Sequence, residues 1–117
     1  SDDQIALFVR QRALSTEAET ALRAVLAKKA EIAAVAAEIS SRNAEMERIF
    51  KDQERLRENL KVLGNRSEER ALVSRYTRQL EEQESRLDVL KLEMADFEAR
   101  RRQLQAELDR MIGDIAF

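Results

Sequence analysis

Residue types that carry much of protein chemistry are missing from this chain of 117 residues. It contains no cysteine, histidine, proline or tryptophan, and only two glycines. Without cysteine, disulfides and thiol chemistry are excluded, and either a reducing or an oxidising compartment suits the chain. Without histidine or cysteine, the usual transition-metal ligands and nucleophile–base pairs are also absent. We therefore expect no catalytic, cofactor or metal site, and predict that the chain is not an enzyme.

Charge of one sign and long apolar runs are also lacking. The 21 basic and 23 acidic residues give a formal net charge of −2, so no global field favours nucleic acid or an anionic membrane. No run of 18 apolar residues occurs, which predicts no membrane span, and the first residues do not resemble a signal peptide. The chain also begins without methionine, and an isolated helical arm usually belongs to a larger assembly, so we expect it to be part of a larger protein.

A heptad repeat in the second half is the most informative feature that is present. Apolar side chains follow each other at alternating spacings of three and four residues, which places one seam along a helix face. The repeat consists of Val73, Tyr76, Leu80, Gln83, Leu87, Leu90, Met94, Phe97, Arg101, Leu104, Leu108, Met111 and Ile115. A matching stripe runs over residues 22–63. The pattern predicts an all-α fold, a long antiparallel two-helix coiled-coil hairpin able to dimerise into a four-helix bundle.

Turn and capping signals predict the boundaries of the hairpin. Residues 1–14 suit either a helix turn or a short strand. Thr16 and Glu19 then form a capping-box pattern, which predicts that the hairpin occupies residues 15–117 and that its first helix covers about 16–63. Gly64 is expected in a left-handed conformation, and Ser67 is expected to cap the second helix. The turn is thus placed at 64–67 and the second helix at about 68–116, which gives two helices of nearly equal length.

The first helix shows a less regular seam than the second. We assign to it Val25, Lys29, Ile32, Ala36, Ile39, Asn43, Met46, Ile49, Gln53, Leu56, Leu60 and Leu63. Two adjoining gaps of three residues, at Asn43, Met46 and Ile49, predict a stammer.

Two registers between the helices are compatible with these seams. A tight loop places Ile49 opposite Gln83 and small Ala36 opposite large Phe97. Sliding one helix along the other by half a heptad pairs Gln53 with Gln83 instead. We favour the tight loop.

Polar residues interrupt both seams. Gln53, Gln83 and Arg101 occupy seam positions, and polar residues there commonly set register and orientation at some cost in stability. We therefore interpret these three as register-setting residues rather than as ligands.

Apolar side chains outside the seams are candidates for protein contact. Val89 and Leu92 lie on the outer face of the second helix, and Ile112 flanks its seam. Together with the alanine-rich stretch 18–37, they favour an interface with a second copy, forming a homodimer, or with another domain of the parent protein.

Exposed arginines are the other candidate contacts. Arg66 and Arg70 lie at the expected turn, although a turn needs polar residues in any case. Arg100 and Arg102 flank Arg101 in the densest basic cluster, as in helical arms that bind nucleic acid. Carboxylates four residues upstream favour simple surface charge for that cluster, so nucleic-acid binding is the less favoured interpretation.

One stretch carries features that heptads do not dictate. It runs from Ile49 to Leu60, with the motif Asp52-Gln53-Glu54-Arg55, and is followed by Arg75-Tyr76. With these residues, the chain from about residue 15 resembles the C-terminal helical region of bacterial proteins of unknown function related to the mucoidy-inhibitor type. The resemblance implies a larger parent with β-rich domains before this segment. Residues 1–14 would then be the exit from the preceding domain, and no activity is implied.

These observations favour a structural or protein–protein interaction coiled-coil arm, part of a larger protein. The alternative is a nucleic-acid-binding helical arm. No cofactor is expected, and composition leaves the compartment open.

Overall fold

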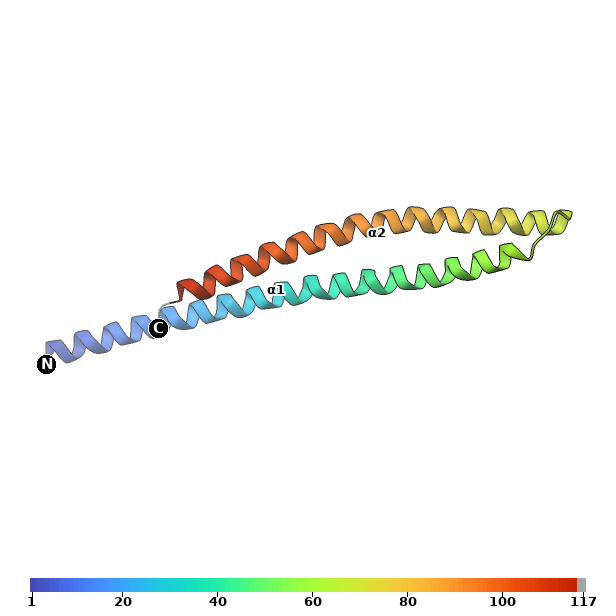
Figure 1. The fold of residues 1–117 in the computed structure, drawn as a ribbon. Helices are drawn as coiled ribbons and strands as arrows, with labels where there is room; N and C mark the ends of the chain where they lie inside the picture. The colour runs from blue at the N-terminus through green and yellow to red at the C-terminus, as the bar shows by residue number, and fades with distance from the viewer. Residues whose placement is uncertain (116–117) are drawn as a thin grey trace. The chain divides into compact units, whose positions relative to one another are not determined.

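The computed structural model describes residues 1–115, which form two long helices joined by a short loop. Helix α1 covers Asp2–Lys61 and helix α2 covers Ser67–Asp114, and the described residues include no strand (Figure 1). The predicted all-α helical hairpin is therefore confirmed. Its helices are unequal, with 60 residues in α1 and 48 in α2, whereas the sequence predicts nearly equal lengths.

The chain divides into two compact units, each containing part of both helices. The tip unit consists of Ala37–Glu98 and includes the loop. The open-end unit consists of Ser1–Ala36 and the described part of Ala99–Phe117. Each unit buries its own leucine-rich core: Ile39, Leu56, Leu87 and Leu90 in the tip unit, and Val25, Leu104 and Leu108 in the open-end unit.

The start of α1 differs from the prediction. The helix begins at Asp2, so residues 1–14 are neither a strand nor separate from the long helix. The capping box predicted at Thr16 is wrong. The hydroxyl of Thr16 instead donates to the carbonyl oxygen of Arg12, four residues earlier, at 3.0 Å, which satisfies a threonine within a helix. The idea that residues 1–14 leave a preceding domain stays a prediction.

The loop between the helices occupies residues 62–66 and is closed by a side chain. The amide of Gly64 donates to Oε2 of Glu69 at 2.6 Å. A Cβ at Gly64 would lie 2.6 Å from the same oxygen, so the close approach of this carboxylate favours glycine. The predicted left-handed conformation of Gly64 is wrong, because no described residue has a positive φ. Ser67 is the first residue of α2 and not the residue before it.

The seam of α2 agrees with the predicted heptads. Every predicted member is buried or half-buried except Arg101, which is exposed. This face of α2 therefore packs on α1 in both units.

The seam of α1 is more regular than predicted. It consists of the buried and half-buried residues Val25, Lys28, Ile32, Val35, Ile39, Arg42, Met46, Ile49, Gln53, Leu56, Leu60 and Leu63. This set alternates spacings of three and four without interruption, so the predicted stammer is wrong. The error came from assigning the seam to Lys29, Ala36 and Asn43 in place of their neighbours Lys28, Val35 and Arg42. Lys29 and Asn43 are exposed, whereas Ala36 is half-buried beside the seam.

Candidate interaction surfaces

A network of ion pairs crosses between the helices in the tip unit. Arg42 of α1 donates from Nε to Glu93 Oε2 of α2 at 3.3 Å, and its guanidinium also pairs with Glu38. Arg86 of α2 donates two hydrogen bonds to Glu45 of α1, at 2.6 and 3.0 Å, and lies 4.0 Å from Glu93. Glu93 thereby joins one arginine from each helix into a chain of five charges.

Arg42 brings this network into the seam. Its guanidinium carbon lies 4.7 Å from the centroid of the Phe97 ring, so the cation also covers an aromatic face. Its side chain is 24% exposed, which keeps the charge near water while the stem packs. The hydrogen bonds from Arg86 hold the pKa of Glu45 below its ordinary value and raise the pKa of Arg86. The charges at this point of the seam are therefore mutually paired.

Two glutamines form a polar layer farther along the tip unit. Gln53 is 2% exposed and donates from Nε2 to Glu84 Oε1 at 2.9 Å. Gln83 donates from Nε2 to Asp52 Oδ2 at 2.5 Å. Because each glutamine bonds to the residue beside the other, the two face each other across the helix pair. The tight-loop register, with Gln83 opposite Ile49, is therefore wrong, and the register that pairs the glutamines is observed.

One polar atom of this glutamine layer lacks a hydrogen-bond partner among the described residues. Hydrogen bonds from Arg55 and then from Gln83 hold the pKa of Asp52 below its usual range. The Oε1 atom of Gln83 is buried without a hydrogen-bond partner in the structure. Such an atom lowers stability, and polar layers of this kind are retained where they specify one register. A register-setting role for Gln53 and Gln83 stays a prediction that this geometry fits, whereas Arg101 is exposed and outside the layer.

The open-end unit has a single interhelical ion pair within the described residues. Lys28 of α1 donates from Nζ to Glu107 Oε2 of α2 at 2.8 Å. The hydrogen bond raises the pKa of Lys28 and lowers that of Glu107. Like Arg42, Lys28 is a seam residue whose charge is met by a glutamate of α2, so both basic seam positions of α1 follow one rule.

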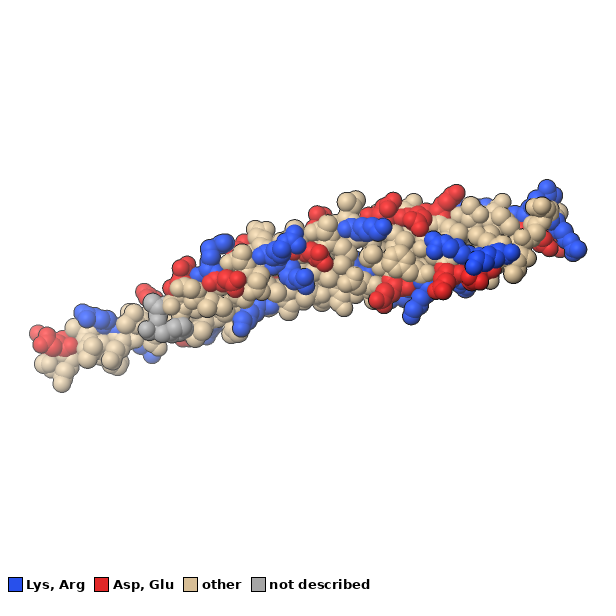
Figure 2. Space-filling model, in the orientation of Figure 1, with Lys and Arg blue, Asp and Glu red and all other residues tan. Residues whose placement is uncertain are grey.

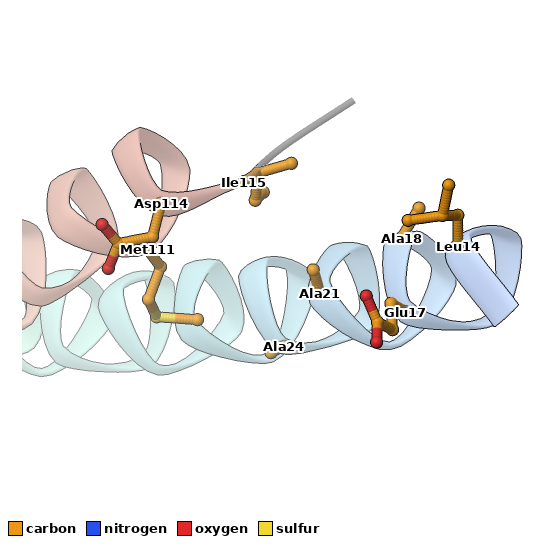
Figure 3. A pocket seen from close by; sticks show the side chains of 8 residues that line it. All are labelled: Leu14, Glu17, Ala18, Ala21, Ala24, Met111, Asp114 and Ile115. Carbon is orange, nitrogen blue, oxygen red and sulfur yellow. The ribbon is translucent and has the colours of Figure 1, made fainter. Parts of the chain in front are cut away.

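A groove lies in the open-end unit, where α2 ends against α1. It has a volume of about 360 Å³. Its apolar lining consists of Leu14, Ala18, Ala21, Ala24, Met111 and Ile115. Figure 3 shows Met111 reaching from α2 toward α1, with Leu14 and Ala18 on α1 beyond the end of α2. The carboxylates of Glu17 and Asp114 complete the lining.

The first turns of α1 have no covering helix in the open-end unit. Residues 1–17 are all exposed. Five large apolar side chains there are between 53% and 68% exposed: Ile5, Leu7, Phe8, Val9 and Leu14. Leu7 and Leu14 continue the seam of α1 at heptad spacing from Ala21, so the helix extends its contact face past the end of α2. We call residues 1–17 the extension.

The apolar candidates predicted from sequence are exposed but scattered. Val89 and Leu92, in the tip unit, are 46% and 70% exposed, and Ile112, in the open-end unit, is 49% exposed. None of them lines the groove. The groove and the extension were missed because residues 1–14 had no assigned structure. Extending the strict heptads backward from Val25 through Leu14 to Leu7 would have revealed the continued face.

The four arginines predicted as contacts are all exposed. Within residues 1–115, Arg66, Arg70, Arg100 and Arg102 take part in no ion pair. Figure 2 shows basic and acidic side chains interspersed over both helices on the visible face. The arginines are therefore accessible, but that face has no continuous basic surface.

The described residues contain no cluster of three or more acidic side chains placed to hold a metal ion. Within the described residues, neither helix contains a stretch that is long and apolar enough to cross a membrane. No protein-family model matches the sequence, and no match was found among curated proteins or solved structures. The resemblance to the mucoidy-inhibitor type therefore stays a prediction.

Proposed function

We propose that this chain is a structural or protein–protein interaction coiled-coil arm of a larger protein, with no catalytic role. The observation that carries the proposal is the extension, with its five large apolar side chains exposed on α1. Large apolar side chains exposed together over a few helical turns typically mark a protein contact. The helix pair supplies the scaffold that presents it.

The extension is not needed to bury the hairpin core. The most buried leucines, Leu56 and Leu90 in the tip unit and Leu104 in the open-end unit, are at most 1% exposed, whereas residues 1–17 are all exposed. Apolar side chains that do not serve the fold are expected to serve association. This separates the contact surface from the scaffold in a way that substitutions can test.

The test is to replace Phe8 and Leu14 together by glutamate and measure the free energy of unfolding at low protein concentration. We expect a change within about 0.5 kcal/mol, as for exposed sites, because neither side chain is buried in a single chain. The matched control is Leu90→Glu, which places a charge in the core and should unfold the tip unit. A large loss of stability in the Phe8 and Leu14 variant would contradict the proposal, because these residues would then serve the fold.

Exposed Arg100 and Arg102 support a second candidate, a nucleic-acid-binding arm. Binding through them would be salt-sensitive, because phosphate contacts release counterions. Arg100→Glu with Arg102→Glu should then abolish binding to single-stranded or double-stranded nucleic acid at low salt. No binding of the unmodified chain at low salt would exclude this candidate.

A further inference from the structure

The large apolar side chains of the extension lie on two different sides of α1. Leu7 and Leu14 continue the seam, the side on which α2 packs farther along the helix. Ile5, Phe8 and Val9 are spaced at i, i+3 and i+4, which places them together on the side away from Leu7. We call these three residues the free face, and their side chains are 59% to 68% exposed. A second helix can approach the free face without meeting α2.

Charges of opposite sign border the free face. Asp2 lies three residues before Ile5, and Arg12 lies three residues after Val9, so both share the side of the helix that carries the free face. Neither charge takes part in an ion pair within residues 1–115. The surface therefore has an acidic end, an apolar middle and a basic end. It complements itself when a second copy lies antiparallel.

We propose that the free face of one chain packs antiparallel on the free face of a second copy, in a symmetric dimer. The inference rests on the proposed interaction function and names its partner. Closed two-fold dimers use the same surface on both copies, as this pairing does. A parallel pairing would instead set Asp2 against Asp2 and Arg12 against Arg12, and like charges placed together oppose association.

One register satisfies the apolar and the charged residues together. Centred on residue 7, it sets Ile5 of each copy level with Val9 of the other. The two Phe8 side chains then flank the same side of the helix pair, close to the two-fold axis. Asp2 of each copy lies level with Arg12 of the other. The apolar middle is thus closed at both ends by an ion pair.

This register keeps the second copy clear of α2. It overlaps residues 1–13 of each chain only, and beyond the overlap the two helices continue in opposite directions. The end of α2 packs on residues 14–24 of α1, outside the overlap. The groove is therefore not part of this interface.

The remaining charged side chains of the extension stay outside the contact. Asp3 and Arg10 lie on the seam side of the helix, away from the free face, and Glu17 lies beyond the overlap. The chain already uses a pair of the proposed kind between its own antiparallel helices, where the carboxylate of Glu107 meets Lys28 on the contact face of α1.

Helix stability also supports an occupant for the extension. A helical segment of this length is marginal in water by itself, because most helical stability comes from packing of an apolar face. Residues 2–13 are helical and all exposed in the single chain. A second extension supplies the missing contact.

The experiment measures mass against concentration for the intact chain by sedimentation equilibrium, from about 10 μM to about 1 mM. We expect a transition from one chain to two within that range, because so short an overlap forms a small interface of the weak, reversible class. Phe8→Glu should abolish the dimer, whereas Leu92→Glu, at an exposed leucine of the tip unit, should leave it intact. A chain that stays monomeric, or forms larger species only, overturns the proposal. Loss of the dimer on Leu7→Glu but not on Phe8→Glu would place the contact on the seam side and also overturns it.

A charge exchange then tests the pairing. Asp2→Arg alone and Arg12→Asp alone each set like charges together at two symmetric positions, and each should raise the dissociation constant about threefold to thirtyfold. The chain carrying both changes should bind more tightly than either single variant, because both pairs are restored with reversed sign. The matched controls are Asp3→Arg, which alters the charge at the helix N-terminus equally, and Arg10→Asp. Both lie on the seam side and should stay within about twofold of the original.

Single changes that have no more effect than their controls, or a double variant weaker than both single variants, overturn the proposed pairing. The proposed function fails separately, through loss of monomer stability on replacing Phe8 and Leu14. Unchanged monomer stability with no dimer would leave the interaction arm standing and remove only the second copy as its partner.

Discussion

The tip unit and the open-end unit use the same two helices but treat polar groups differently. In the tip unit, the glutamine layer and the network around Arg42 connect α1 with α2 at two separate places. In the open-end unit, the single interhelical ion pair among described residues is that of Lys28 with Glu107. Exposed large apolar side chains occur in both units, eight in the open-end unit and five in the tip unit, and five of the eight belong to the extension.

The two units therefore differ in what their side chains do: one determines how the two helices align, and the other offers surface for binding. Directional hydrogen bonds and ion pairs resist sliding, so the polar contacts of the tip unit favour one register between the helices. The open-end unit instead offers an apolar groove and a bare helix face. We interpret the tip unit as the part that defines the hairpin and the open-end unit as the part that binds.

The largest expected effect comes from the core of the tip unit. Leu56 is fully buried, and Leu56→Ala should lower the free energy of unfolding by about 2–4 kcal/mol. Leu108→Ala, at a 5% exposed position of the open-end unit, should cost less, because the core is less enclosed there. Urea unfolding followed by circular dichroism measures both, with exposed Leu92→Ala as control. Equal costs for Leu56 and Leu108 would contradict the comparison.

The register offers the second test. Because the chain has no cysteine, introduced pairs report on it cleanly. Gln53→Cys with Gln83→Cys should form an intrachain disulfide at least about tenfold faster than Ile49→Cys with Gln83→Cys, since disulfides need closely spaced Cα atoms. Electrophoresis without reductant after timed oxidation measures the rates. Faster closure of the pair with Ile49 would restore the tight-loop register.

The network around Arg42 should have a smaller effect. Arg42→Ala removes the contact over Phe97 and two ion pairs, and should cost roughly 1 kcal/mol, with a weaker dependence of stability on salt. Arg100→Ala, at an exposed arginine that forms no ion pair within residues 1–115, is the control and should change little. Thermal unfolding at low and high salt measures both. A cost no larger than that of the control would show that the network does not stabilise the tip unit.

The smallest effect is expected from pH. The pKa values of Glu45 and Asp52 are lower in the folded chain than their ordinary values of 4.5 and 3.8. The stability they contribute is therefore present above those values and is lost as the pH falls through the lower, folded pKa values. Melting temperatures between pH 6 and pH 3 should decline for the unmodified chain. Glu45→Gln should show a shallower decline, and an identical decline would contradict the assignment of Glu45.

The sequence alone predicted the regular parts of the fold. The heptads of α2 were recognisable because every member except Gln83 and Arg101 is apolar, and apolar periodicity is the strongest single-sequence signal. Where two polar residues adjoin, polarity cannot tell which faces the partner. Lys28 was therefore mistaken for Lys29, and Arg42 for Asn43. Uninterrupted heptad spacing would have selected the correct residue in both cases.

Boundary signals were the less reliable guide. The pattern of Thr16 and Glu19 satisfies a capping box but lies inside a continuous helix, since a threonine can also bond back to its own helix. Gly64 follows a helix, where a left-handed glycine is common, yet here its amide donates a hydrogen bond to the carboxylate of Glu69. Such contacts depend on tertiary structure. The groove was missed because residues 1–14 had no assigned helix and because it depends on how the end of α2 packs on residues 14–24 of α1.

The most direct test of the division between a specified tip and a binding open end is hydrogen exchange at several protein concentrations. Amides of residues 45–60, in the tip unit, should be protected equally at all concentrations. Amides of residues 5–14 should exchange rapidly in dilute solution and become protected as the concentration rises. Protection of residues 5–14 that does not change with concentration would contradict this account.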